Sequence, residues 1–318
     1  MKNTPPINIA YCTDSNYIEY VAVSITSIIM NNLSNKINFH VFLYDIDQND
    51  KDKIKSIGNN IEIYEFSKDE VEKYSQDFSI KHLNRAIYLR LAVPRILHKK
   101  ISRLIYLDAD TLCFSDIAEI NNIDINHVVC AVVSDNTKEI NRKNLERLGI
   151  ISDLYFNSGF LYINTENWIK KNIENRVNDI IINNDIVLTY PDQDALNIVL
   201  NNDIVILDSK WNFLFTWLTE AEKNNFFYNK EKLPNIIHFT GGRKPWYQEH
   251  SGLSQDIYIF YKHFTPWANT PLKSYKNKMR STDYRIYSKS EMKKRNYLKG
   301  LYFFIKYLQL KIKSSKGI

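Results

Sequence analysis

Of the 318 residues, only eight are glycine, eight are proline and three are cysteine. So little glycine and proline excludes collagen-like or proline-rich low-complexity architecture. No apolar run approaches the roughly 20 residues needed to cross a bilayer, so no membrane span is predicted. The cysteines Cys12, Cys113 and Cys130 have no metal-like spacing and lie in apolar stretches. We interpret them as small buried residues rather than ligands or disulfides.

The N-terminal residues also lack a basic segment followed by an apolar one, so we expect no secretory signal and a cytoplasmic location. What the chain does contain is 44% hydrophobic, 13% aromatic and 25% charged residues. This composition is typical of a globular protein with one large core or two smaller ones.

The charge is unevenly distributed along the chain, although its net value is only +6. Residues 269–318 contain 14 Lys and Arg against two acids, Asp283 and Glu291, while residues 1–268 carry a net charge of −6. An acidic body with a basic tail indicates an anionic partner for the tail, either a membrane or a nucleic acid.

The end of this tail has a helical pattern at 296–313, with lysines recurring every seven residues on one face. Its other face is apolar and comprises Leu298, Leu301, Tyr302, Ile305, Leu308 and Ile312. Such a basic amphipathic helix can lie in an anionic interface, so we expect peripheral association with the inner face of the cytoplasmic membrane. The alternative is a helix docked on the body. No nucleic-acid-binding module is recognised, so nucleic acid is not an expected partner.

Apolar β-branched runs alternate with segments of helical period, which predicts an α/β fold with a parallel sheet. Strands are expected at 7–12, 38–44, 61–66, 103–107, 128–133, 160–163 and 235–239. Helices are expected at 17–30, 87–96 and 165–182, and a further one begins at Asp192 just after Pro191. No linker precedes about residue 265. We therefore predict a catalytic domain at 1–265 and a membrane-associating tail at 266–318.

The most informative segment delivers Asp108 and Asp110 at the carboxyl end of an apolar strand, the edge where ligands bind in open α/β sheets. Both carboxylates can reach one divalent cation, whose remaining positions would be filled by phosphate oxygens and water. A bland alternative is that they cap the next turn. A functional alternative is the nucleophile motif of haloacid-dehalogenase-like phosphatases. That family carries its motif on the first strand, whereas a βαβαβ pattern precedes it here.

Six ordered motifs over roughly residues 7–250 resemble those of the retaining nucleotide-sugar glycosyltransferases of family 8, especially bacterial enzymes that extend lipopolysaccharide or lipooligosaccharide core. They are AYCTDSNY (10–17), YLRL (88–91), DAD (108–110), YFNSG (155–159), PDQDALN (191–197) and IHFTGGRKPW (237–246). The resemblance implies the Rossmann-like GT-A fold and a UDP-hexose donor.

For the nucleotide, the resemblance implies that Asp14 accepts the imide N–H of uracil and Tyr17 stacks on the ring. Thr13 and Asn16 would shape the turn between them, although Tyr17 could instead be a hydrophobic staple at the start of a helix. Arg90 would reach the sugar and phosphate side of the donor. Its alternative is a solvated helix arginine.

For the metal, the resemblance implies that His238 joins Asp108 and Asp110 as the third protein ligand. Two oxygens and an imidazole favour Mn²⁺, with Mg²⁺ as the alternative. Ala109, within the same signature, would contact the donor. Gly241 would let the backbone approach the pyrophosphate, and Lys244 would add a positive charge to it.

For the sugar, the resemblance implies a pocket lined by Asp135, Asn157, Asp192 and Gln193, with Gln193 closest to the anomeric carbon. Asp192 is also a candidate helix N-cap. A double displacement needs a carboxylate nucleophile, and an amide is a poor one. We therefore expect same-face attack, in which the leaving diphosphate oxygen takes the proton of the acceptor.

The expected function is metal-dependent transfer of a hexose from UDP-glucose or UDP-galactose to a glycan, with retention of the α configuration. The expected acceptor is lipopolysaccharide core or another lipid-linked oligosaccharide. A self-glucosylating primer protein resembling glycogenin is a further alternative, which the 21 tyrosines allow. A sugar-binding protein without activity is another.

Overall fold

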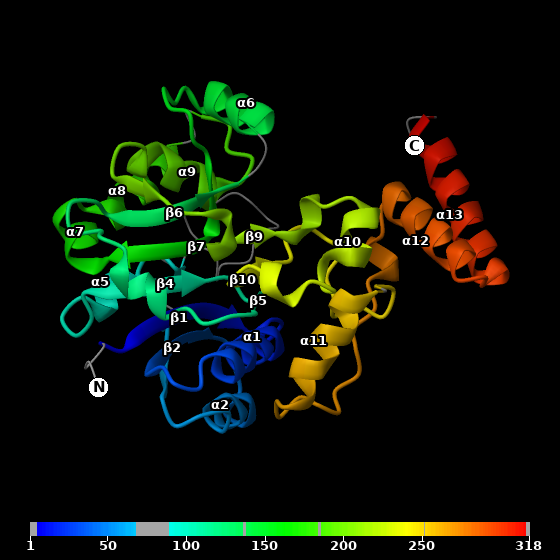
Figure 1. Ribbon diagram of the computed structural model, residues 1–318. Coiled ribbons are helices and arrows are strands. Elements are labelled where there is room, and N and C mark those ends of the chain that lie inside the picture. The colour runs from blue at the N-terminus through cyan, green and yellow to red at the C-terminus, as the bar shows by residue number, and fades with distance from the viewer. Residues whose placement is uncertain (1–4, 68–88, 136–137, 184–185, 251, 316–318) are drawn as a thin grey trace.

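The computed structural model describes residues 5–67, 89–135, 138–183, 186–250 and 252–315. They form a central seven-stranded sheet, a small three-stranded sheet and a helical C-terminal segment (Figure 1). Tyr88 of the YLRL motif and the start of the helix predicted at 87–96 lie outside the described residues.

The central sheet has the strand order β3-β2-β1-β4-β7-β6-β8. Neighbouring strands are parallel except where β7 pairs with β4 and β6. The strands are β1 (Ile7–Asp14), β2 (Ile37–Tyr44), β3 (Ile61–Glu65), β4 (Arg103–Leu107), β6 (Cys130–Ser134), β7 (Phe156–Asn164) and β8 (Ile204–Ile206). The predicted α/β class is confirmed.

The direction of β7 corrects the prediction of a wholly parallel sheet. Between β6 and β7 lies α6 (Lys138–Leu148), which buries Leu145 and Leu148 against Tyr155 in a small cluster distinct from those on the two faces of the sheet. A parallel strand would need a connection that crosses a face of the sheet. Because α6 does not make that crossing, the chain re-enters the sheet from the end where it left.

Helices cover both faces of the sheet and give three layers. Alternate residues of β1 point to opposite faces, so Ile9 and Ala10 lie in different apolar clusters. The cluster with Ile9 contains residues of α1 (Ile18–Asn31) and α2 (Gln48–Lys55). The cluster with Ala10 contains residues of α5 (Val93–Leu97), α7 (Thr165–Lys170), α8 (Ile173–Asn183) and α9 (Pro191–Leu200). The cysteines are free, with Cys113 and Cys130 buried.

Two predicted helices have different limits in the structure. The helix predicted at 165–182 is divided into α7 and α8, because Asn172 between them has a φ of 52° and interrupts the right-handed helix. The helix predicted from Asp192 begins one residue earlier, at Pro191, with Tyr190 as its N-cap. The alternative that Asp192 is the N-cap is therefore wrong.

Several elements were not predicted from the sequence. They include α2, α6, β8 and five elements outside the central sheet and its layers: β5 (Thr111–Cys113), β9 (Phe213–Leu214), α10 (Glu220–Phe226), α11 (Leu253–His263) and α12 (Ser281–Lys293). Most are short or strongly polar, so they carry little hydrophobic periodicity.

The small sheet has the order β5-β10-β9 and brings distant segments together. β10 (Ile236–His238) runs antiparallel to β5, with His238 opposite Thr111. The N–H of Phe239 donates to the carbonyl of Asp110 at 2.9 Å. The end of β10 therefore lies against the turn that follows β4.

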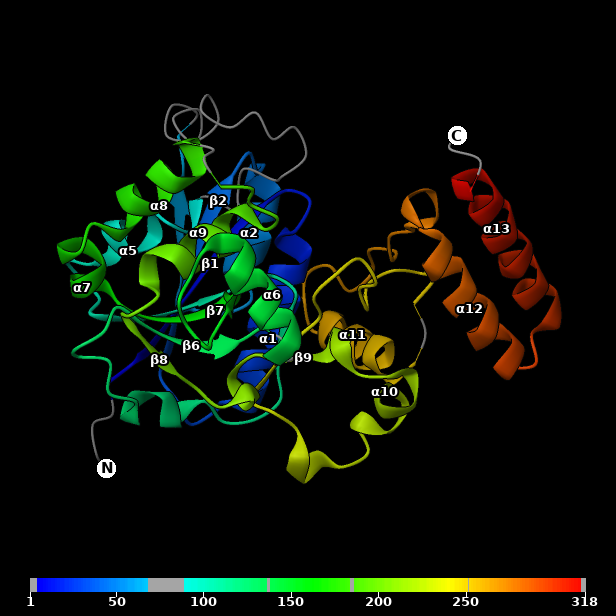
Figure 2. The same cartoon turned by 90° about the horizontal axis from the view of Figure 1, so that it is seen from above.

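The C-terminal segment has two parts. The first packs on the body: Trp267 belongs to the apolar cluster of α1, and Lys262 of α11 pairs with Glu19 of α1. The second is a hairpin of α12 and α13 (Tyr297–Ser315), which lies apart from the sheet in both ribbon views (Figures 1 and 2). Residues on both sides of position 265 thus pack on the body. The predicted domain division at this position stays a prediction.

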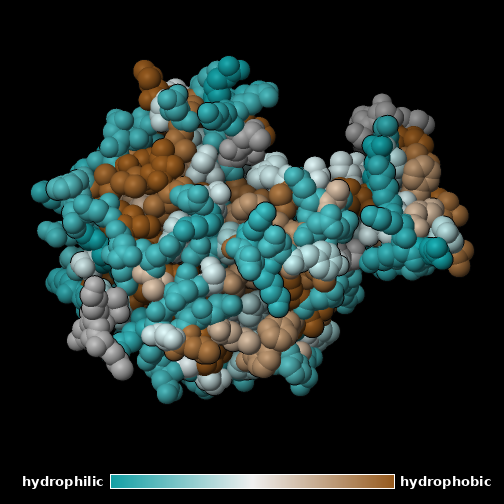
Figure 3. Space-filling view, in the orientation of Figure 1, coloured by the Kyte–Doolittle hydropathy of each residue, from teal (hydrophilic) through white to brown (hydrophobic). Residues whose placement is uncertain are grey.

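The apolar face predicted for 296–313 is exposed on α13. Leu298 is 87% exposed, and Leu301, Ile305 and Ile312 are each about half exposed. Figure 3 shows hydrophobic residues along the outer side of this helix. Phe303, by contrast, is buried between the two helices of the hairpin. Of the helices that the structure describes, none combines the length and apolarity that a bilayer crossing requires.

Candidate active site

Three side chains from two sheets meet at the carboxyl end of β4. Asp108 and Asp110 lie on the turn between β4 and β5, and His238 ends β10. One ligand atom from each lies within 4.8 Å of the other two, and His238 Nε2 is 3.0 Å from Asp110 Oδ1. Two carboxylates and an imidazole form a donor set that fits Mn²⁺ or Mg²⁺.

Gly159 of β7 makes room for this cluster. A Cβ atom there would overlap the His238 ring and lie 2.9 Å from Asp108 Oδ2. The Gly159 carbonyl also accepts a hydrogen bond from the N–H of Asp108 at 2.9 Å. Any side chain at this position would displace a candidate metal ligand, which explains the glycine of the YFNSG motif.

A chain of buried hydroxyl groups anchors the turn between β4 and β5. The Thr111 hydroxyl donates to the Asp108 carbonyl at 2.9 Å and is hydrogen-bonded to Ser24 of α1 at 3.1 Å. Ser24 is hydrogen-bonded to Tyr11 of β1 at 2.8 Å. The turn is therefore tied to both the sheet and the helix behind it.

Two cations predicted to contact the donor lie against the carboxylates. Arg90 Nη2 is 3.1 Å from Asp108 Oδ1, and Lys244 pairs with Asp110. Burial raises the pKa of Asp110, but the charges of Lys244 and His238 outweigh burial and hold that pKa well below its usual range. Burial also raises the pKa of Asp192, against the effect of Arg90, whose Nη1 is 3.4 Å away. Arg90 is buried and thus not a solvated arginine.

Asn212 orients the imidazole of His238. Asn212 Oδ1 accepts a hydrogen bond from His238 Nδ1 at 3.0 Å, so the other ring nitrogen, Nε2, faces the carboxylates. Asn212 Nδ2 in turn donates to Asn157 Oδ1 at 2.9 Å. Sequence reasoning missed Asn212, because no pattern in the sequence connects it with His238.

The residues predicted to line the sugar pocket are brought together. Gln193 Oε1 accepts hydrogen bonds from Asn157 Nδ2 and from the N–H of Ser158, both at 3.1 Å. Asn157 Nδ2 also donates to Asp135 Oδ1 at 3.1 Å, and Ser158 donates to Asp192 Oδ2 at 3.4 Å. Burial raises the pKa of Asp135. Asn212 connects this network to the cluster of possible metal ligands.

A second layer holds Gln193 and was not assigned from the sequence. Gln193 Nε2 donates to the Tyr155 hydroxyl at 3.0 Å, which donates to Asp194 at 2.6 Å. Asp194 is fully buried and accepts from Arg147 at 2.9 and 3.0 Å. Tyr155 and Asp194 stand inside quoted motifs, but nothing in the sequence pairs them with Arg147.

The residues predicted to bind the nucleotide lie at the end of β1 and in the turn that follows it. The N–H of Asn16 donates to Asp14 Oδ1 at 3.0 Å and closes a tight turn. Thr13 is buried, whereas Tyr17 is 38% exposed and meets the Trp246 ring edge-on at a centroid distance of 6.5 Å. Lys273 of the C-terminal segment donates to the Asn16 carbonyl at 3.1 Å.

The two remaining predicted donor contacts lie on the turns around the carboxylates. Ala109 stands between Asp108 and Asp110 and packs partly on the core. Gly241 is exposed in the loop after β10, with a φ of 76° that a residue with a Cβ rarely adopts.

Comparison with known proteins agrees with this geometry. The profile of glycosyl transferase family 8 matches residues 8–250, and that of the family 8 C-terminal region matches residues 254–311. A lipopolysaccharide 1,2-glucosyltransferase of Escherichia coli (strain K12) is 31% identical over 83% of this chain and 79% of its own. A lipopolysaccharide 1,3-galactosyltransferase of Salmonella typhimurium is 28% identical over 96% and 91%. The crystal structure of the galactosyltransferase LgtC in complex with donor and acceptor sugar analogues has a TM-score of 0.69, at 20% identity over 82% of this chain and 96% of that one.

The fold and site together define a glycosyltransferase of the GT-A type. More narrowly, the chain belongs to glycosyl transferase family 8. The family and fold predicted from the six motifs are confirmed, and the phosphatase alternative is thereby excluded.

Proposed function

We propose that the protein transfers a hexose from UDP-glucose or UDP-galactose to a lipid-linked glycan and retains the α configuration. The observation that carries the proposal is the connection of two groups of residues. The Asp108, Asp110 and His238 cluster is hydrogen-bonded through Asn212 to the network that holds Gln193. Ligands for a diphosphate-bound metal thus lie beside polar groups suited to a sugar.

Asp108, Asp110 and His238 would hold Mn²⁺ or Mg²⁺ in this enzyme. Such an ion would neutralise negative charge on the donor diphosphate. Arg90 and Lys244 surround the same carboxylates and add two fixed positive charges to that side of the site. Gly241, on the exposed loop after β10, offers backbone without a side chain for close approach of the pyrophosphate.

The turn after β1 would bind the uridine. Asp14 provides a carboxylate acceptor for the imide N–H, and the exposed ring of Tyr17 provides a surface for stacking. The buried Thr13 and the hydrogen bond from Asn16 hold the turn in shape. Ala109 would complete the contact with the donor next to the metal ligands.

The expected reaction is same-face attack. The bond between the anomeric carbon and the diphosphate oxygen breaks, the acceptor oxygen bonds to that carbon, and the acceptor proton passes to the leaving oxygen. Gln193 Oε1 is already engaged by two donors, so it is a weak nucleophile. Its role would be to position and stabilise the reacting centre, while Asp135, Asn157 and Asp192 accept or donate hydrogen bonds to sugar hydroxyls.

The acceptor is proposed to be a lipopolysaccharide core or a related glycan, because relatives that cover most of the chain are named for such transfers. The exposed apolar face and the lysines of α13 support peripheral association with an anionic membrane that carries this acceptor. The proposal also includes a preference for Mn²⁺ over Mg²⁺ and a donor that is either UDP-glucose or UDP-galactose.

A screen of UDP release tests the proposal. We expect release from UDP-glucose or UDP-galactose with Mn²⁺, and little without a divalent ion. Asp110→Asn and His238→Ala should each remove most activity and metal-dependent UDP binding. Asp256→Asn, an exposed carboxylate of α11, is the matched control and should keep both. Normal UDP release by His238→Ala would contradict its role as a ligand.

The stereochemistry of the product tests the role of Gln193. Gln193→Ala should lower kcat more than it weakens donor binding, because its proposed contact is with the reacting centre. NMR of the product should show an α linkage. A β linkage would contradict same-face attack and would require a general base among Asp135, Asp192 and Asp194. Added hexoses on the protein itself, seen by intact-mass analysis, would instead support a self-glucosylating primer.

A further inference from the structure

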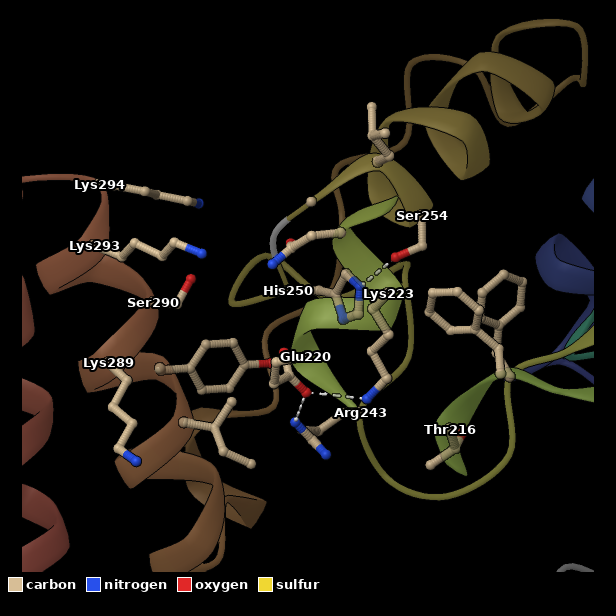
Figure 4. Close-up of a pocket in the computed structure, with 17 residues that line it drawn as sticks. Thr216, Glu220, Lys223, Arg243, His250, Ser254, Lys289, Ser290, Lys293 and Lys294 are labelled. Carbon is tan, nitrogen blue, oxygen red and sulfur yellow. Dashed lines mark hydrogen bonds and ion pairs between the residues drawn. The ribbon is translucent and has the colours of Figure 1, made fainter. Parts of the chain in front are cut away.

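A separate pocket lies between α10, α11 and α12. Its cavity volume is about 630 Å³, which is within the range of sites for small molecules. Figure 4 shows Lys289 and Lys293 of α12 and Lys294 at its C-cap facing a wall formed by α10 and by the segment that leads into α11. Arg243, on the loop after β10, lies across the pocket from Lys289 and beside Glu220.

The charge of the lining is strongly positive. Five basic residues and a single acid, Glu220, contribute to it. Glu220 is already engaged by Lys223 at 3.0 Å and by Arg243 at 3.4 Å. The basic residues are Lys223, Arg243, Lys289, Lys293 and Lys294.

Lys289, Lys293 and Lys294 do not pair with Glu220, the one acid of the lining. An acid outside the lining, Glu291, lies 3.9 Å from Lys294. The lining therefore has an excess of positive charge that an anion could neutralise.

The pKa of His250 is affected by the same positive charges. Burial, together with the charges of Arg243, Lys223 and Lys294, lowers the pKa of His250 to about 4 against the opposing effect of Glu220. The imidazole is hydrogen-bonded to Ser254 at 2.8 Å. It therefore presents an uncharged polar group at neutral pH.

The remaining lining is apolar or aromatic. Phe215, Phe239, Leu253, Ile286 and Tyr287 contribute to it, together with hydroxyl groups such as those of Thr216 and Ser254. Hydroxyl and amide groups suit sugar hydroxyls, an aromatic ring suits the apolar face of a pyranose, and the lysines suit a phosphate. The combined chemistry is that of a phosphorylated sugar.

We propose that this pocket binds a phosphorylated sugar residue of the acceptor glycan. The proposal rests on the proposed function for its acceptor. Consecutive residues of one loop connect the two sites, because Lys244 pairs with Asp110 whereas Arg243 faces Glu220 and the pocket. The diphosphate of the donor already has charge partners at the metal ligands, so the pocket is assigned to the acceptor.

The position of the pocket favours a sugar phosphate over a lipid headgroup. The lysines concerned are on α12 or at its C-cap and face α10, whereas the exposed apolar residues are on α13. If the apolar face of α13 inserted into a bilayer, the lysines of the pocket would not thereby contact the lipid headgroups. Membrane binding and sugar phosphate binding are therefore predicted to depend on different residues.

The test measures binding of mannose 6-phosphate, mannose and inorganic phosphate to the full chain by titration calorimetry. Lys289→Gln, Lys293→Gln and Lys294→Gln are combined in one variant. The matched control combines Lys99→Gln, Lys170→Gln and Lys278→Gln, which remove the same charge from exposed residues outside both the pocket lining and α13. Melting temperature and UDP release without acceptor are measured for both.

We expect mannose 6-phosphate to bind at least tenfold more tightly than either mannose or inorganic phosphate. The pocket variant should lose at least tenfold in affinity, while the control variant and the UDP release of both stay within twofold of wild type. Excess UDP should not displace the probe.

Four results would overturn the proposal. They are equal loss in the control variant, displacement by UDP, binding of phosphate as tight as that of the sugar phosphate, and loss of binding to anionic vesicles in the pocket variant without loss of mannose 6-phosphate binding. Absence of UDP release in the wild type would instead contradict the proposed function, and the binding data would still decide whether the pocket recognises a sugar phosphate.

Discussion

At the scale of residues, the orientation of His238 depends on Asn212. Asn212→Ala removes the acceptor of the Nδ1–H and should weaken Mn²⁺ affinity by about 10-fold to 100-fold. Asn212→Asp keeps an acceptor for Nδ1 but loses the donor to Asn157, so it should retain more of the metal affinity. Titration of metal-dependent UDP binding measures both, and wild-type affinity in Asn212→Ala would refute the positioning role.

Gly159 offers a second prediction at this scale, because a methyl group there would overlap His238 and approach Asp108. Gly159→Ala should displace one of these ligands, abolish metal-dependent UDP release and cost about 1–3 kcal/mol of unfolding free energy. The control is Gly58→Ala, where the nearest atom to the new Cβ would be at an ordinary 3.5 Å. Activity and denaturant unfolding are measured for both, and full activity of Gly159→Ala would show that the site accommodates the methyl group.

At the scale of elements, α12 and α13 form a unit with its own apolar contacts. Gly300 lies against Met292, and its carbonyl accepts a hydrogen bond from Ser288 at 2.8 Å. Phe303 fills the space between the helices with Tyr287. The exposed apolar face of α13 takes no part in these contacts, so it is available to another surface.

This arrangement leads to a prediction on membrane binding. Leu298→Ser, Ile305→Ser and Ile312→Ser in one variant should abolish sedimentation with anionic vesicles and leave UDP release unchanged, because all three side chains are exposed. Each basic residue near an anionic surface contributes roughly 1 kcal/mol of attraction, and salt screens this attraction. Vesicle binding by the wild type should therefore weaken markedly as the salt concentration rises. Undiminished sedimentation of the variant would reject the role of this face.

Truncation after Ala268 tests the predicted domain division rather than the helix alone. It also removes Lys273, which contacts Asn16, and Tyr275, whose ring stacks on Tyr247 at 4.7 Å. We therefore expect some loss of UDP binding from this truncation, in contrast to the serine variant of α13. Normal UDP binding would instead support a catalytic unit that ends near residue 265.

At the scale of the whole molecule, the body and the hairpin meet around His250, whose pKa is lowered to about 4 by burial and by Arg243, Lys223 and Lys294. Because the folded pKa is below the ordinary value of about 6.5, the unfolded chain binds the proton more readily. The contribution of His250 to the free energy of unfolding should be fully present above about pH 6.5. It should fall by roughly 3 kcal/mol as the pH decreases to about 4. His250→Gln should flatten this part of the profile of unfolding free energy against pH. An unchanged profile would show that other groups govern it.

The sequence by itself determined the features that depend on neighbouring residues. The apolar runs of β1 and β4, the position of Asp108 and Asp110 at a strand end, and the two faces of α13 all follow from local periodicity. The order of the six motifs was enough to predict the family and to select Asp108, Asp110 and His238, which the structure brings together. The structure keeps these local patterns because each helix or strand buries its own apolar side.

The tertiary structure alone decided the features that depend on pairing between distant segments. The antiparallel direction of β7 follows from where α6 packs, and the contact of His238 with Asp110 follows from the pairing of β5 with β10. Asn212 meets His238, and the lysines at the end of α12 come to line a pocket, only where other elements pack against them. These contacts are set by the packing of whole layers, and no local period in the sequence encodes them.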